Sequence, residues 1–488
     1  MTLDPLRHVL GRPAPTPAAV TPGVPTPSPS VPVAAPHAST PATSAPPLVA
    51  VADDTLRRVA RLFARAGFGA TRDEITTWAG RGYTAAVDHL LQLSAADRRA
   101  ASLDAQLQIG LAGPSNNIAP AQDWWLKRMA TTQHPLVEKM ALYWHGHFAT
   151  ANNKVESPAM MLRQNQLFRD QAFGDFRVLC KEVTIDPAML RWLDGQANRR
   201  GKPNENYARE FMELFTLGVG RYRQSDVRDA ARALTGWTPG SNGAAQLVPA
   251  YHDDGLKLIL GQGPADFGAE DLTDLVLDHH PEGNVAATHL ARRVAAFFHR
   301  PDPEPAVVAA MAASVTAPEG RPYPVADMLR TLLLRPEFMD GTGVTIKSPA
   351  ELVAGVARAL NLTGQMSKLR QQMHHMGQDL FNPPNVAGWP GGESWANTST
   401  VIARYNFGLT AAKLVDDNSF DSLLDTQGSN AASVQTWMDR LGILELSAET
   451  RAAIDDYVST AHTNRDSTAA IKRSIITLLI ASPDYNLR

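Results

Sequence analysis

The segment from Glu138 to His147 has the residue types of a metal or acid–base site, with one carboxylate and two histidines, His145 and His147, among aromatic residues. Glu138 and His145 would share a helix face, but a separation of about 10.5 Å along the axis makes them awkward partners for one ion. The two histidines would point about 200° apart, so they share a metal only if the helix ends near Gly146. The alternative is that both histidines hydrogen-bond to the backbone or to a carboxylate, as buried polar groups must.

A second group of polar residues lies on the predicted helix Glu205–Leu217, for which Asn204 is a suitable N-cap. On helical spacing four side chains share the face opposite the apolar residues, namely Asn206, Arg209, Glu210 and Glu213. If that face lined a cleft, one glutamate would act as the acid and the other as the base. Arg209 would keep one of them ionised or bind an anionic substrate, and Asn204 and Asn206 would contact the substrate. The alternative is a solvated face with an i,i+4 ion pair between Arg209 and Glu213.

His252 stands directly before Asp253-Asp254-Gly255, and these residues resemble a metal-binding cluster. Asp-Asp-Gly is also ordinary turn chemistry, and short apolar runs on both sides predict a small β-hairpin over residues 246–260. A turn does not require a histidine. His252 is therefore the third candidate metal ligand, after His145 and His147.

An irregular stretch from Phe381 to Trp395 places Trp389 and Trp395 beside amide and acidic side chains, those of Asn382, Asn385 and Glu393. Tryptophan rings cover the apolar faces of sugars or peptides, while neighbouring polar groups bind hydroxyls or amides. Trp389 and Trp395 are therefore candidate substrate-binding residues. The alternative is a loop that packs into the core and caps helix ends.

Composition narrows the classes of function. A net charge of -3 gives no overall field that would hold nucleic acid or an anionic membrane. The single cysteine, Cys180, has an apolar context and is predicted to be a core residue. No apolar run is long enough for a transmembrane helix, and no secretory signal is recognisable, so a cytoplasmic location is the default expectation.

The chain divides into two parts. Residues 1–50 form a Pro/Ala/Thr-rich tail that is expected to be disordered, because it has too little apolar surface to offset the entropy of ordering. Residues 51–488 show helical periodicity almost throughout, which predicts one large all-α, multi-helix domain with one small β-hairpin inserted in it. The predicted helices include Pro135–Phe148, Val285–Phe298 and Pro349–Leu360.

Several blocks follow one another in order along the chain, at residues 63–71, 138–150, 186–194, 204–218, 230–237, 382–389 and 403–407. Together they resemble the bacterial domain of unknown function 1800 family, over about residues 55 to 488. The resemblance implies no catalytic residues. Members of that family are often exported, and they are often encoded beside a phosphatase- or sulfatase-like protein of a second unknown-function family. The resemblance implies the same expectations for this protein.

These observations lead to two hypotheses. In the first, the protein is a hydrolase or lyase for a sugar- or peptide-like substrate. Glu210 and Glu213 act with His145, His147 or His252, which serve as acid–base groups or as ligands of a divalent metal, and the Trp389–Trp395 loop forms the substrate wall. In the second, it is a non-catalytic scaffold or binding protein that works with the phosphatase- or sulfatase-like partner.

Overall fold

The computed structural model of the chain describes residues 53–92, 116–240, 243–315, 322–341, 343–416 and 430–488. The chain separates into two units, Met1–Pro47 and Leu48–Arg488, and all the described residues belong to the second. The tail predicted over residues 1–50 lies outside the described residues.

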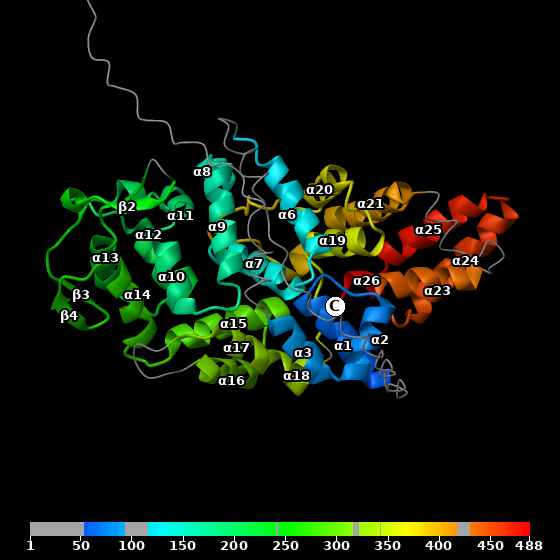
Figure 1. Cartoon of the computed structure of the whole chain (residues 1–488), viewed down its shortest axis with the longest axis horizontal. Coiled ribbons are helices and arrows are strands. Elements are labelled where there is room, and N and C mark those ends of the chain that lie inside the picture. Colours follow the sequence, from blue (N-terminus) through cyan, green and yellow to red (C-terminus); the bar gives the residue numbers. More distant parts are fainter. Residues whose placement is uncertain (1–52, 93–115, 241–242, 316–321, 342, 417–429) are drawn as a thin grey trace, which may run out of the picture. The chain divides into compact units, whose positions relative to one another are not determined.

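Helices make up most of the second unit, which confirms the all-α prediction (Figure 1). Those of the first half are α1 (Asp53–Ala66), α2 (Arg72–Arg81), α3 (Tyr83–Leu91), α6 (Ala119–Thr131), α7 (Pro135–His147), α8 (Asn152–Val155), α9 (Pro158–Asp170), α10 (Phe176–Thr184), α11 (Pro187–Trp192), α12 (Glu205–Glu210) and α13 (Gln224–Ala233). Those of the second half are α14 (Ala269–Asp278), α15 (Val285–Phe298), α16 (Pro305–Val315), α17 (Val325–Leu333), α18 (Pro336–Met339), α19 (Pro349–Ala359), α20 (Met366–His375), α21 (Thr398–Leu414), α23 (Asn430–Leu441), α24 (Ala448–Thr463), α25 (Thr468–Ala481) and α26 (Pro483–Asn486). Shorter turns are the 3-10 helices η1 (Gly195–Ala197), η3 (Pro249–Tyr251) and η4 (Gly392–Ala396) and the π-helix η2 (Phe211–Leu217).

Local sequence signals set several helix ends. Ser348 caps α19 in a capping box, because its hydroxyl accepts the Glu351 N–H while the Glu351 carboxylate accepts the Ser348 N–H. Asn204 caps α12 as predicted, its side chain accepting the Asn206 N–H at 3.0 Å. The bounds of α15 are those predicted from periodicity.

The helix predicted over Glu205–Leu217 is α-helical only as far as Glu210, and its second half is the π-helix η2. A π-turn holds more residues than an α-turn, so positions after Glu210 rotate away from the α-helical wheel. The α-helical prediction therefore misplaces Glu213 relative to Glu210 around the helix axis.

The small β element is present as two hairpins rather than one, and the predicted pairing is wrong. Strand β1 (Trp237–Pro239) pairs with β2 (Ala245–Leu247), and β3 (Lys257–Ile259) pairs with β4 (Gln262–Ala265). The two apolar runs beside Asp254-Gly255 thus belong to different hairpins. Each apolar run pairs with a strand that lies on its other side from Asp254-Gly255. The local sequence pattern alone does not reveal which strands pair.

Helix α7 is buried along almost its whole length. It contacts α1, α3, α6 and α9, and every residue except Pro135 and Gly146 is buried. Four of the buried side chains are polar: Glu138, Lys139, His145 and His147. Each must therefore be paired inside the protein or border a cavity.

Two further features of the core bear on the sequence predictions. Cys180 is fully buried, as predicted, and burial raises the pKa of its thiol. Among the helices that the structure describes, none combines the length and the apolar character that crossing a membrane requires.

Candidate functional site

A cavity of about 540 Å³ lies beside Trp389, and we call it the Trp389 pocket. Its walls come from segments far apart in the chain: α7, α15, the start of α19 with the residues leading into it, the segment from Trp389 into η4, and Arg488. The volume is typical of small-molecule sites, which are mostly apolar with a few polar groups. The residues used below are Tyr143, His147, Arg293, Glu351, Trp389, Glu393, Trp395 and Arg488.

Close backbone approach fixes the Trp389 loop against α7. Gly388 has a φ of 83°, and a Cβ at that position would lie 2.2 Å from the carbonyl oxygen of Gly146. Only glycine fits this conformation and this contact. The loop places the Trp389 ring edge-on to His145, with the ring centroids 5.4 Å apart.

Asn382 and Asn385, which belong to the same stretch, hold backbone rather than the cavity. The Asn382 side chain accepts the N–H of Asn153 at 3.2 Å, and that of Asn385 accepts the N–H of Ala387 at 2.9 Å. In this stretch Trp389 and Trp395 line the pocket, while the two asparagines hold the loop.

His147 and Tyr143 form a polar part of the pocket wall. His147 Nε2 donates to the Phe215 carbonyl at 3.0 Å, so the neutral ring carries its lone pair on Nδ1. The buried His147 Nδ1 and Tyr143 hydroxyl have no hydrogen-bond partner within the described part of the chain. Burial, followed by the charge of Arg293, lowers the pKa of His147 well below its ordinary value, so the ring is neutral at physiological pH.

His145 is also held by a backbone group. Its Nε2 accepts the N–H of Phe381 at 3.1 Å, and its ring packs against Trp125 and Phe381. Burial lowers the pKa of His145 to about 3. Its Nε2 lone pair is occupied, and the ring stays neutral at physiological pH.

Glu138 is the centre of a buried ion network rather than a catalytic group. Arg169 donates to both of its carboxylate oxygens at 2.7 and 2.9 Å, Arg128 donates at 2.6 Å and Trp125 at 3.0 Å. Burial alone would raise the pKa of Glu138, but Arg169 and Arg128 outweigh burial and lower it. This carboxylate therefore remains ionised and anchors α7 to α9 and α6.

Glu351 lines the Trp389 pocket from a buried position, which we call the pocket floor, and several basic side chains surround it. It forms ion pairs with Lys139 and, at 3.0 Å, with Arg488. Burial would raise the pKa of Glu351, but Arg488 and Lys139 lower it to about 2. Burial lowers the pKa of Lys139 and of the nearby Lys347 to about 7.

Sequence reasoning missed Arg293, which lines the pocket from α15 and is half-buried. It lies close enough to Tyr143 and His147 to influence both electrostatically. A signal was available, because Leu290, Val294 and Phe297 flank it at helical spacing and place it at the edge of the apolar face of α15. Glu351 also carried a signal, as the fourth residue of a capping box, but that pattern predicts only a helix start.

The predicted acidic face stands apart from the Trp389 pocket, since neither Glu210 nor Glu213 lines it. Burial and the neighbouring Glu213 raise the pKa of Glu210, while the Tyr222 hydroxyl donates to Glu213. Arg209 pairs with Glu205 at 3.1 Å instead of the expected Glu213.

The asparagines of this segment are committed to local structure. Besides capping α12, Asn204 donates to the Asp194 carbonyl at 3.3 Å, and Asn206 donates to the Leu193 carbonyl at 3.3 Å. They join α12 to the segment after α11 and, like the glutamates, do not line the Trp389 pocket.

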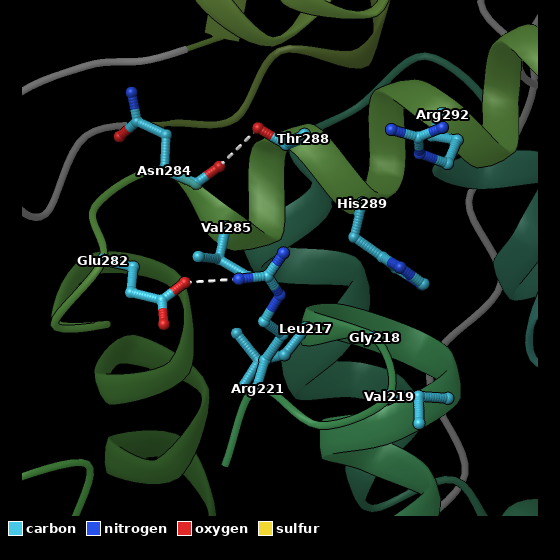
Figure 2. A pocket seen from close by; sticks show the side chains of 10 residues that line it. All are labelled: Leu217, Gly218, Val219, Arg221, Glu282, Asn284, Val285, Thr288, His289 and Arg292. Atoms are coloured by element: carbon cyan, nitrogen blue, oxygen red, sulfur yellow. Dashed lines mark hydrogen bonds and ion pairs between the residues drawn. The ribbon is translucent and has the colours of Figure 1, made fainter. Parts of the chain in front are cut away.

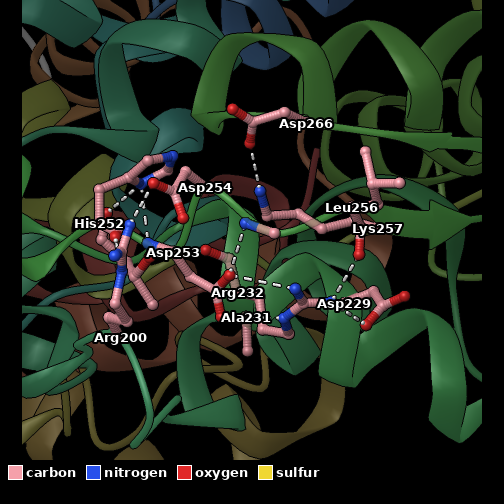
Figure 3. Close-up of polar contacts among 12 residues, drawn as sticks. Arg200, Asp229, Ala231, Arg232, His252, Asp253, Asp254, Leu256, Lys257 and Asp266 are labelled. Atoms are coloured by element: carbon pink, nitrogen blue, oxygen red, sulfur yellow. Dashed lines mark hydrogen bonds and ion pairs between the residues drawn. The ribbon is translucent and has the colours of Figure 1, made fainter.

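His252 belongs to a separate polar network, shown in Figure 3. Its Nδ1 donates to the Thr235 carbonyl at 2.9 Å, and Arg232 bonds both carboxylate oxygens of Asp253 at 3.0 Å. Asp253 also accepts the N–H of Gly255 at 2.9 Å, as turn chemistry requires. The cluster is thus internally paired. Across all described ranges, no three His, Cys, Asp or Glu side chains gather as a metal site would need.

A second cavity, of about 530 Å³, lies between the end of η2 and the start of α15 (Figure 2). His289 on its wall donates to the Leu214 carbonyl at 3.0 Å, next to the Phe215 carbonyl that His147 bonds. The two histidines thus satisfy carbonyls that the end of the π-helix leaves free, with ring centroids 6.5 Å apart. A backbone hydrogen bond thus accounts for one ring nitrogen of each of these two histidines.

Comparison with known proteins identifies a matching family model. No curated protein and no solved structure matches the chain in these comparisons. The family model described as "Protein of unknown function (DUF1800)" matches residues 61–487, nearly the whole described domain. That match confirms the resemblance seen in the sequence blocks, and the chain belongs to the DUF1800 family.

Proposed function

We propose that the helical domain binds a small sugar- or peptide-like molecule in the Trp389 pocket. One observation carries the proposal: Trp389 and Trp395 line a cavity of about 540 Å³ together with charged and polar side chains from distant segments. Aromatic rings would cover the apolar face of the ligand, and the polar groups would orient it. A tightly packed core would not leave such a space.

Trp389→Ala tests the proposal. Sugars and N-acylated amino acids are screened for thermal stabilisation of the full chain, because a ligand at about 100 times its Kd stabilises the folded state by about 2.7 kcal/mol. The matched control is Trp192→Ala, which removes a half-buried tryptophan outside the pocket lining. We expect stabilisation of wild type and of the control only. Equal stabilisation of Trp389→Ala would rule the pocket out as the ligand site.

A hydrolase or lyase is the second candidate, and the position of Glu393 favours it. This carboxylate lines the pocket, is exposed, and has no hydrogen bond or ion pair with another described residue. Such a group would be free to act as acid or base on a bound ligand. His145, which is neutral and bonded to the backbone, and Glu210, which does not line the pocket, are less suited to that role.

Glu393→Gln separates the two candidates. If the protein is an enzyme, hydrolysis of chromogenic glycosides or amides falls at least about 100-fold in this variant while binding is retained. The control is Glu449→Gln, an exposed glutamate on α24. Activity that is equal in both variants would remove Glu393 from the reaction.

The family resemblance adds a partner to this proposal, a phosphatase- or sulfatase-like protein of a second unknown-function family. Co-purification of the two proteins when expressed together would support it. Independent migration on size-exclusion chromatography at micromolar concentrations would contradict a stable complex.

A further inference from the structure

The two arginines that line the Trp389 pocket differ in how they are paired. Arg488 forms an ion pair with Glu351 and donates to the Phe297 carbonyl at 3.1 Å. Arg293 is half-buried and forms no hydrogen bond or ion pair with any residue of the described ranges. A partly desolvated guanidinium gains most from a carboxylate, which matches its planar donors in a bidentate geometry.

The side chains behind the pocket carry an excess of positive charge, the same sign as that of Arg293. Glu351 is surrounded by four basic side chains: it pairs with Lys139 and Arg488, and it interacts electrostatically with Lys347 and Arg404. Arg488 and Arg404 keep their charge at neutral pH, while Lys139 and Lys347, whose pKa values burial lowers to about 7, are partly protonated. The one carboxylate of Glu351 therefore does not balance the positive charge around it. An anion inside the pocket would offset this excess where the local dielectric is low.

The remaining acidic residue of the lining does not supply this anion. Glu393 is exposed, and water screens its charge at the surface. Arg293 and the pocket floor therefore present a net positive environment to any ligand that enters.

We propose that the ligand of the Trp389 pocket is a small organic carboxylate whose acidic group binds Arg293 while its ring or apolar part lies against Trp389. This inference rests on the proposed binding function and names its ligand class. Acidic sugars and N-acylated amino acids both have this chemistry. In both, a carboxylate lies within a few bonds of a ring or an apolar group.

Two matched ligand pairs test the inference by isothermal titration of the full chain: glucuronate against glucuronamide, and N-acetyltyrosinate against N-acetyltyrosinamide. Within each pair the compounds differ in the charged group and little else. We expect the acid of at least one pair to bind about tenfold more tightly than its amide, as a charge-assisted hydrogen bond implies. Arg293→Gln should abolish that preference.

The neighbouring arginine provides the control. Arg292 is exposed and lines the second cavity (Figure 2), so Arg292→Gln should keep the preference for the acid. If amides bind as tightly as acids, or if the preference survives Arg293→Gln, the inference is overturned and the binding pocket stands. If none of the four compounds binds at millimolar concentration, both the inference and the proposed sugar- or peptide-like ligand fail.

Discussion

Glu138→Gln is expected to lower the free energy of unfolding by about 3 to 5 kcal/mol, the cost of removing one partner from a buried ion pair. Glu138 and Arg169 are each about 1% exposed, and two arginines depend on this carboxylate. Arginine cannot release its proton at any accessible pH, so Arg169 would remain charged and incompletely paired in the core. Glutamine keeps the shape and one acceptor, which isolates the effect of the charge.

The control for this prediction is Glu205→Gln, which removes the carboxylate from the partly exposed pair with Arg209. Surface pairs contribute about 0 to 1 kcal/mol, so guanidinium unfolding of the control should resemble that of wild type. If Glu138→Gln were as stable as Glu205→Gln, the network around α7 would not be what holds α7, α6 and α9 together.

Glu351→Gln is expected to cost about 3 kcal/mol at pH 7, because it leaves Lys139 and Arg488 without their carboxylate. The loss should be smaller than for Glu138→Gln. Burial already lowers the pKa of Lys139 to about 7, so this lysine can lose its proton when its partner is removed, whereas Arg169 cannot. Thermal unfolding of both variants at pH 7 and pH 8 measures the difference.

The pH dependence of Glu351 gives an independent check. Its folded-state pKa of about 2 lies below the ordinary glutamate value of about 4.3, so its contribution is complete above about pH 4.3 and is lost as the pH falls towards 2. The stabilities of wild type and Glu351→Gln should therefore converge between about pH 4 and pH 2. A difference that stays constant over that range would mean that the charge of Glu351 does not stabilise the fold.

Helical periodicity predicted the main elements because burial of one helix face is a local property of the sequence. The range of α15 was predicted to the residue, and the N-cap at Asn204 followed from residue type alone. The π-helix after Glu210 was not predicted, because it depends on what the freed carbonyls of Leu214 and Phe215 find, and they find His289 and His147 from distant helices.

The lining of the Trp389 pocket was predicted in part. Sequence placed Trp389, Trp395 and His147 in one composite site, and all three line the Trp389 pocket. Glu210 and Glu213 do not line it, because their inclusion assumed that polar segments converge, and periodicity carries no information on which helices meet. Arg293 was missed, because the sequence of α15 alone does not show that this residue lines the same cavity as Trp389.

The measurement that tests the Trp389 pocket most directly is the NMR spectrum of the indole N–H groups in ¹⁵N-labelled protein titrated with N-acetyltyrosinate. The chain has nine tryptophans, and the signals of Trp389 and Trp395 are assigned from Trp389→Phe and Trp395→Phe. A ligand in the pocket should shift these two signals and leave that of Trp192 in place. Shifts confined to other tryptophans, or no shift at saturating ligand, would contradict ligand binding in the Trp389 pocket.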